Sequence, residues 1–217
     1  KQIVITTHRG PDGDAMGSSL AMMHLLKQFG HHVYLITPNS YAEFLHWMPG
    51  NDDVIIFDEN KKEAQEITAN ADIIFLMDFS NINRIADYSA TVSDSSATKV
   101  LIDHHQNPDT SIAEIIFSYT EACSTAQLVY EVIEAMDLTN HITKAIAECL
   151  YVGIMTDTGS FKYSGVTIKT HKIVSELISF DINHTSIHNN LFDMQNKSRI
   201  ELLRVCLNNL ELIESQN

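Results

Sequence analysis

Residues 3–19 read IVITTHRGPDGDAMGSS, and this stretch decides the fold class. Its first five residues are apolar or β-branched, which is typical of a strand that is buried on both faces. The loop after it contains Pro11 and Gly13, which break helices, so we expect its polar side chains to lie on a loop and not on a helix face. A helix should follow and end at Gly30, because apolar residues recur at helical spacing at Met22, Leu25, Leu26 and Phe29.

Apolar runs and helical segments alternate along the rest of the chain. Short apolar runs recur after the first helix at residues 33–36, 54–57, 73–77 and 100–102. Helical patterns are expected at residues 61–70, 124–136, 142–155, 183–192 and 197–214. This order predicts an α/β fold: a doubly wound, mostly parallel β-sheet flanked by helices, with a helical C-terminal part.

Acidic residues dominate the charge of the chain. Asp and Glu number 28 against 14 Lys and Arg, which gives a formal net charge of -14 over 217 residues. A protein that coats long DNA needs a net basic face, so this balance argues against a long DNA track. It is compatible with a small phosphate ligand, because carboxylates can bind metal ions that in turn bind phosphate.

Cysteine usage and apolar runs indicate the compartment. Three cysteines, Cys123, Cys149 and Cys206, lie far apart, which favours reduced thiols over a disulfide framework. No apolar run reaches the length of about 18 residues that a transmembrane helix needs. The opening residues KQIVITTH lack the apolar region of a signal peptide. We therefore predict a cytoplasmic protein with no membrane partner.

Metal-type ligands follow three of the predicted strands. In chain order they are His8, Asp12 and Asp14, then Asp78, then Asp103, His104 and His105. A fourth segment, TDTGS over 156–160, follows the apolar helix and adds Asp157. Because sites in parallel α/β sheets form at the carboxyl ends of the strands, we expect these side chains to lie at one edge of the sheet.

A mixed set of Asp and His ligands suits a pair of divalent ions. Two ions about 3.5–4 Å apart can clamp a phosphate and generate a hydroxide nucleophile, and a carboxylate must bridge them. This ligand set suits Mn²⁺ better than Ca²⁺ or structural zinc, and Mg²⁺ and Co²⁺ are the other candidates.

Single elements of this pattern also have simpler explanations. An Asp after a strand is often a helix cap, which applies to Asp78, and Asp12-Gly13 is also a turn signal. We place residues 17–19 in the first turn of the helix, where free backbone N–H groups favour an anion or an acidic side chain such as Asp14. Four such elements in one chain favour a shared site over separate caps and turns.

The four segments together resemble a known family. HRGPDGDAMGSS (8–19), MDFSNINRI (77–85), IDHHQNP (102–108) and TDTGSF (156–161) look like the four ordered motifs of the DHH phosphoesterase superfamily. They most resemble the branch with a DHHA1 domain, which includes bacterial oligoribonucleases (nanoRNases), pAp phosphatases and exopolyphosphatase-related proteins. The resemblance spans residues 8–161.

The resemblance implies a role for each motif residue. His8 and Asp12 would bind one metal ion, and Asp78 would bridge both ions. The second ion would be bound by Asp14, His104 and Asp157. His105 would face the substrate phosphate, and Asp103 would fix the tautomer and orientation of a histidine. Arg84 and Lys162 are substrate-binding candidates, with a surface ion pair as the alternative for Arg84 and only a point charge offered by Lys162.

The activity implied by the resemblance is two-metal hydrolysis of short RNA from an end, or of pAp, through a metal-bound hydroxide. Pyrophosphate, polyphosphate and cyclic dinucleotides are alternative substrates, and a metal- or nucleotide-binding module without turnover is the alternative outside enzymes. We predict a DHH catalytic domain over 1–195. Residues 196–217 would connect it to a DHHA1 domain, whose glycine-rich motif the chain lacks. A homodimer is expected by analogy only.

Overall fold

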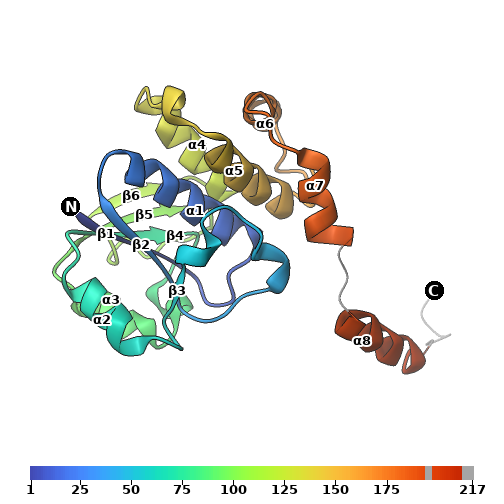
Figure 1. Cartoon of the computed structure of the whole chain (residues 1–217), viewed down its shortest axis with the longest axis horizontal. Helices are drawn as coiled ribbons and strands as arrows, with labels where there is room; N and C mark the ends of the chain where they lie inside the picture. Colours follow the sequence, from blue (N-terminus) through green and yellow to red (C-terminus); the bar gives the residue numbers. More distant parts are fainter. Residues whose placement is uncertain (194–196, 212–217) are drawn as a thin grey trace.

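A six-stranded parallel sheet forms the centre of the computed structural model, which describes residues 1–193 and 197–211 (Figure 1). The strands are β1 (Gln2–Thr7), β2 (His32–Thr37), β3 (Ile55–Ile56), β4 (Ile73–Met77), β5 (Thr98–Asp103) and β6 (Ile115–Ser118). Their order is β3-β2-β1-β4-β5-β6, and each neighbouring pair is parallel. The strand order reverses direction between β1 and β4, so the predicted doubly wound sheet is confirmed and its switch point lies there.

Helices cover both faces of this sheet. The described residues form the helices α1 (Gly13–Gln28), α2 (Lys61–Ala69), α3 (Tyr88–Asp94), α4 (Thr125–Ala135), α5 (Lys144–Asp157), α6 (Ile168–Ile178), α7 (His184–His188) and α8 (Lys197–Asn208). Figure 1 shows α1, α4 and α5 on one face and α2 and α3 on the other. Alternate side chains of β1 point to opposite faces of the sheet. Ile3 and Ile5 pack in the core under α1, α4 and α5, and Val4 packs in the core under α2 and α3.

Two glycines allow α1 and α5 to approach closely. A Cβ atom at Gly17 of α1 would lie 2.5 Å from the carbonyl oxygen of Cys149, which is too close for any real side chain. A Cβ atom at Gly153 of α5 would lie 2.5 Å from Cβ of Ala126 and 2.7 Å from Oδ1 of Asp14. Helix α5 therefore packs directly on the first turns of α1 and α4.

The start of α1 corrects the expectation of a loop. Asp12 caps the helix, because its Oδ1 accepts hydrogen bonds from the N–H groups of Asp14 and Ala15, both at 3.0 Å. The cap lets the helix begin at Gly13, two residues after Pro11, so Asp14 is in its first turn and residues 17–19 are beyond that turn. The first-turn placement of residues 17–19 was therefore wrong.

The C-terminal ends of several helices also differ from the prediction. Asp157 is the last residue of α5 and does not follow the helix. Helix α7 ends at His188 and continues as a π-helical turn over Asn189–Asp193. Helix α8 ends at Asn208, and residues 212–214 of the predicted helix lie outside the described residues.

Helix α8 lies apart from the sheet in Figure 1, and its residues are exposed. It presents the apolar side chains Ile200, Leu202, Leu203, Val205 and Leu207 to solvent. None of the helices in the described parts of the chain is both long enough and apolar enough to cross a membrane.

Candidate metal centre

The six predicted metal ligands meet at the carboxyl ends of the three central strands. His8 and Asp12 follow β1, Asp78 follows β4, and His104 follows β5. Two helices add the other ligands: Asp14 lies in the first turn of α1, and Asp157 is the last residue of α5. The sheet switch point and the close α1–α5 packing thus bring together residues as far apart in sequence as 8 and 157.

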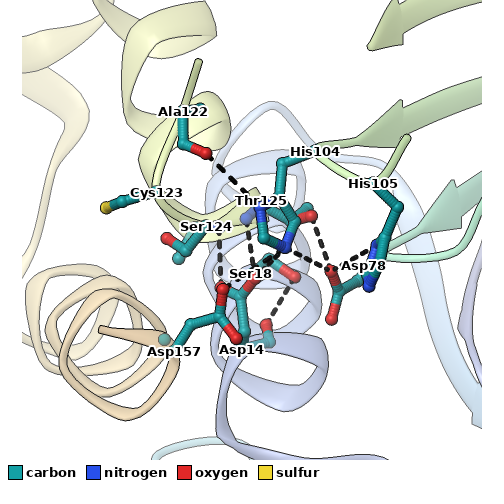
Figure 2. Close-up of polar contacts among 12 residues, drawn as sticks. Asp14, Ser18, Asp78, His104, His105, Ala122, Cys123, Ser124, Thr125 and Asp157 are labelled. Carbon is teal, nitrogen blue, oxygen red and sulfur yellow. Dashed lines mark hydrogen bonds and ion pairs between the residues drawn. The ribbon is translucent and has the colours of Figure 1, made fainter. Parts of the chain in front are cut away.

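Two sets of ligand atoms share this edge. Within each set, one atom from each residue lies within 4.8 Å of the others: His8, Asp12 and Asp78 in the first, and Asp14, His104 and Asp157 in the second. Asp78 connects the sets, because its Oδ2 lies 3.6 Å from Nε2 of His8. Its Oδ1 lies 3.8 Å from Nε2 of His104 (Figure 2). Its two oxygens thus face different sets, as a bridging carboxylate requires.

His8 and His104 present Nε2 to the carboxylates because Nδ1 of each ring is bonded to a backbone carbonyl. His8 Nδ1 donates to the carbonyl oxygen of Arg9 at 3.0 Å, and His104 Nδ1 donates to that of Ala122 at 3.4 Å. Nε2 of His104 lies 3.3 Å from Oδ2 of Asp157. These backbone bonds leave the Nε2 lone pairs available to a metal ion.

Asp14 is held by the first turn of α4. The backbone N–H of Thr125 donates to its Oδ2 at 2.6 Å, and that of Ala126 donates to its Oδ1 at 2.9 Å. The expectation that N–H groups of residues 17–19 would favour Asp14 was therefore wrong, because the groups that bind it come from another helix. A side chain in the first turn of α1 points away from the N–H groups of its own helix and across to α4.

Asp78 occupies an unusual backbone conformation. Its φ is 65°, in the left-handed region that residues other than Gly, Asn and Asp rarely adopt. It is not a helix cap: its N–H donates to the carbonyl oxygen of Ile102 at 3.0 Å, and its Oδ1 accepts from the hydroxyl of Thr125 at 2.7 Å. The turn directs the carboxylate back over the ends of β1 and β5.

Burial and crowding of like charges shape the electrostatics of the centre. Burial, followed by the charges of Asp78 and Asp157, raises the pKa of Asp14 well above its usual value. Burial also raises the pKa of Asp157, and the nearby Asp78 and Asp12 carboxylates add to this effect although His104 opposes it. Burial alone would lower the pKa of His8, but Asp78 and the Arg9 carbonyl outweigh it and raise that pKa. The carboxylates thus lie closer together than their charges favour.

The donor set fits divalent cations. No Lys or Arg side chain forms an ion pair with the clustered aspartates in the part of the chain that the structure describes. Carboxylate oxygens and imidazole nitrogens are ligands of first-row divalent ions, and such ions would neutralise the crowded carboxylates. The centre could hold metal through its predicted ligands.

His105 lies beside the two sets. Its Nδ1 donates to Oδ1 of the fully buried Asp103 at 2.7 Å and lies 3.8 Å from Oδ1 of Asp78. The hydrogen bond to Asp103 raises the pKa of His105, against the opposing effect of burial. The side chain is 45% exposed, so a solvent molecule or ligand can reach the ring. His105 can also form a third ligand group with Asp78 and His104.

The two basic substrate-binding candidates stand apart from this network. Arg84 and Lys162 are both exposed, and neither side chain forms a hydrogen bond or ion pair with the centre within the described residues. Their assignment to substrate binding stays a prediction.

Sequence reasoning missed the contribution of Thr125. The Ser124-Thr125 pair was identified as the start of a helix, and Ser124 does cap α4 by accepting from the N–H of Gln127 at 3.0 Å. A hydroxyl residue next to a cap is the only signal in the sequence, and it does not reveal that the cap faces two aspartates from α1 and β4.

A family model and several known proteins match this chain in sequence. Residues 2–154 match the family model for the N-terminal domain of the DHH family. The chain is 28% identical over 195 residues to the bifunctional oligoribonuclease and PAP phosphatase NrnA of Bacillus subtilis, and 28% identical over 181 residues to that of Thermus thermophilus. It is 25% identical over 167 residues to the cyclic-di-AMP phosphodiesterase PdeA of Listeria monocytogenes.

Solved structures share the fold. An exopolyphosphatase-related protein from Bacteroides fragilis has 37% sequence identity and a TM-score of 0.94 over 98% of this chain and 62% of its own. A putative family II inorganic pyrophosphatase from Methanococcus jannaschii, at 16% identity and a TM-score of 0.62 over 87% of this chain and 60% of its own, shows the same fold.

The matches cover most of this chain but less of each relative. They take in 88% of the chain and 57% of the Bacillus protein, 83% and 50% for the Thermus protein, and 74% and 25% for the Listeria protein. The chain therefore corresponds to about half the length of the two NrnA relatives.

Proposed function

The chain belongs to the DHH family, and we propose that it is a phosphoesterase that uses two divalent metal ions to hydrolyse short oligoribonucleotides from an end, or pAp. The observation that carries this proposal is the pair of ligand sets that Asp78 connects. The names of the two NrnA relatives support the substrate class.

The proposed centre assigns the ligands as two groups. His8 and Asp12 would hold one ion, Asp14, His104 and Asp157 would hold the other, and Asp78 would hold both. The mixture of oxygen and nitrogen donors favours Mn²⁺, with Mg²⁺ and Co²⁺ as the other candidates. When bound, the two ions would supply an activated water and positive charge for the phosphate oxygens.

His105 is the proposed residue that acts on the substrate directly. Asp103 orients its ring and favours its protonated form, and Nδ1 of the ring lies 3.8 Å from Oδ1 of Asp78. A protonated imidazole there can donate a hydrogen bond to a phosphate oxygen or a proton to the leaving oxygen.

Other substrates are the competing possibilities. The likeness to a cyclic-di-AMP phosphodiesterase favours a cyclic dinucleotide as the second candidate. Pyrophosphate and polyphosphate are further candidates with the same bond chemistry. A binding module without turnover would keep the metal ions but release all of these ligands unchanged.

The test is a parallel assay with Mn²⁺. The chain, and a longer form if one exists, is incubated with pAp, di- to pentaribonucleotides, cyclic di-AMP, pyrophosphate and polyphosphate. Asp78→Asn should abolish hydrolysis and keep the fold. The matched control is Asp94→Asn, which changes an exposed aspartate on α3, on the opposite face of the sheet. Undiminished turnover by Asp78→Asn, or no turnover of any substrate by the wild type, would refute the proposal.

The domain division and the homodimer stay predictions. We propose residues 1–195 as the catalytic domain and 196–217 as a connector to a DHHA1 domain, and the greater length of the relatives supports this division. The exposed apolar residues of α8 are compatible with contact to such a domain or to a second copy of the chain.

A further inference from the structure

Thr125 makes two hydrogen bonds to two different proposed metal ligands. It is the first residue of α4 and is fully buried. Its backbone N–H donates to Oδ2 of Asp14 at 2.6 Å, and its hydroxyl donates to Oδ1 of Asp78 at 2.7 Å (Figure 2). One residue thus links a carboxylate from α1 to a carboxylate that follows β4.

The first turn of α4 directs its free donors at the centre. The N–H groups at a helix start have no partner within the helix and carry partial positive charge. Those of Thr125 and Ala126 are both taken by Asp14, and that of Gln127 by the capping hydroxyl of Ser124. The threonine hydroxyl is the one side-chain group of this turn that reaches Asp78.

These bonds leave the carboxylates free to bind metal. A carboxylate can accept about four hydrogen bonds or metal bonds in total. Asp14 uses one position on each oxygen, and the Thr125 bond uses one position on Oδ1 of Asp78. What the bonds restrict is the rotation of each carboxylate group, because both are buried and have donors on a rigid helix.

We propose that Thr125 is a positioning residue of the metal centre, whose hydroxyl fixes the plane of the Asp78 carboxylate so that its two oxygens face the two ligand sets. The inference rests on the proposed metal centre but not on its substrate. Without the hydroxyl, the Asp78 side chain can rotate about its terminal bond, and the separation of the two sets is no longer fixed. Hydrogen-bond partners of metal ligands typically change metal affinity by 10- to 100-fold.

The test uses one isosteric and one rescuing variant. Thr125→Val keeps the shape and the backbone N–H that binds Asp14, and removes only the bond to Asp78. Thr125→Ser keeps the hydroxyl. Mn²⁺ affinity and stoichiometry are measured by electron paramagnetic resonance of free and bound Mn²⁺, on proteins whose fold is verified by circular dichroism without metal. We expect Thr125→Val to bind Mn²⁺ about 10- to 100-fold more weakly and Thr125→Ser to match the wild type.

A matched control separates positioning from packing. Thr68 is also fully buried, but its hydroxyl donates to the carbonyl oxygen of Ala64 in the α2–α3 layer. Thr68→Val should lower thermal stability and leave Mn²⁺ affinity unchanged. If Thr125→Val does not fold, Thr125→Ala is compared with Thr125→Ser in its place.

The outcomes distinguish this inference from the proposed activity. Wild-type Mn²⁺ affinity in folded Thr125→Val or Thr125→Ala overturns the positioning role. If the wild-type chain binds two Mn²⁺ ions but hydrolyses no substrate, the proposed activity is refuted. The comparison of the Thr125 variants still decides the positioning role in that case. A wild-type chain that binds no Mn²⁺ overturns both.

Discussion

His105 is the residue whose role the geometry leaves most open to experiment. It can act on the substrate, or it can bind metal with Asp78 and His104. Because Asp103 already takes its Nδ1 and the ring is 45% exposed, we predict the first role. His105→Asn should lower hydrolysis by about 10²–10⁴-fold, the usual contribution of a general acid or base, and leave two Mn²⁺ ions bound.

The control for this prediction is His32→Asn, which changes an exposed histidine at the start of β2. Loss of one bound Mn²⁺ ion in His105→Asn would contradict the prediction and assign His105 as a ligand. Full activity of that variant would exclude it from the reaction.

The three thiols should differ in reactivity. Burial raises the pKa of Cys123 to about 11, and it also raises the pKa of Cys149, whereas Cys206 on α8 is exposed. Because the thiolate is the reactive form, a raised pKa leaves little of it at pH 8. We expect Ellman's reagent to titrate one thiol rapidly in the native chain and three after unfolding. Native Cys206→Ser should show no rapid phase; a rapid phase in that variant would contradict the burial of the other two.

Individual ligands were predictable from the sequence, but their supports were not. Asp78 and His104 stand directly after apolar strands, and the rule for parallel sheets places such residues at one edge. The bond from Thr125 to Asp78 joins residues 47 positions apart, through a side chain on one element and a turn with positive φ on another. No local pattern encodes that distance, because it depends on how α4 packs on the sheet.

At the scale of elements, the close contact of α5 with α1 and α4 predicts that a Gly-to-Ala substitution in α5 lowers stability instead of raising it. Replacing Gly by Ala inside a helix normally stabilises it by about 1 kcal/mol. At Gly153 the added methyl would lie 2.5 Å from Cβ of Ala126 and 2.7 Å from Oδ1 of Asp14. Gly153→Ala should therefore destabilise the chain by about 1–3 kcal/mol and weaken Mn²⁺ binding, as measured by urea unfolding and by Mn²⁺ titration.

Gly165→Ala provides the control, because its new methyl would meet only Cβ of Cys123, at 3.9 Å. It should leave both stability and Mn²⁺ affinity close to the wild type. Unchanged metal affinity in Gly153→Ala would mean that Asp14 can move aside without loss.

The elements that the sequence predicted well are those with a strong period or an apolar run. β4 was predicted at its observed bounds, and α4 within one residue. β6 was missed because its four residues lie at the edge of the sheet, where exposed and half-buried positions alternate over too short a length. α6 was missed although Thr167 and Thr170 form a capping box, because Thr at the second position departs from the usual Glu or Gln.

For the whole molecule, the crowded carboxylates predict strong stabilisation by metal. Ions that bind only the folded chain add about 2.7 kcal/mol for a site at 100 times its dissociation constant. For a chain of this size that corresponds to a rise in melting temperature of about 5–10 °C, and a chelator should reverse it. Calorimetry with and without Mn²⁺ measures the shift. Asp78→Asn should remove most of it, and an equal shift in that variant would place the stabilising ions elsewhere.

The left-handed turn at Asp78 also bears on how this chain would evolve in the laboratory. A residue held in such a conformation costs about 1–3 kcal/mol, and here its carboxylate is also buried beside other acids. Gly at this position would relieve the backbone strain and would also remove the repulsion between the Asp78 carboxylate and the neighbouring acids. A directed-evolution screen that rewards only expression yield, in medium depleted of metal, should therefore enrich Gly or Asn at position 78 and select efficiently folded but catalytically dead lineages.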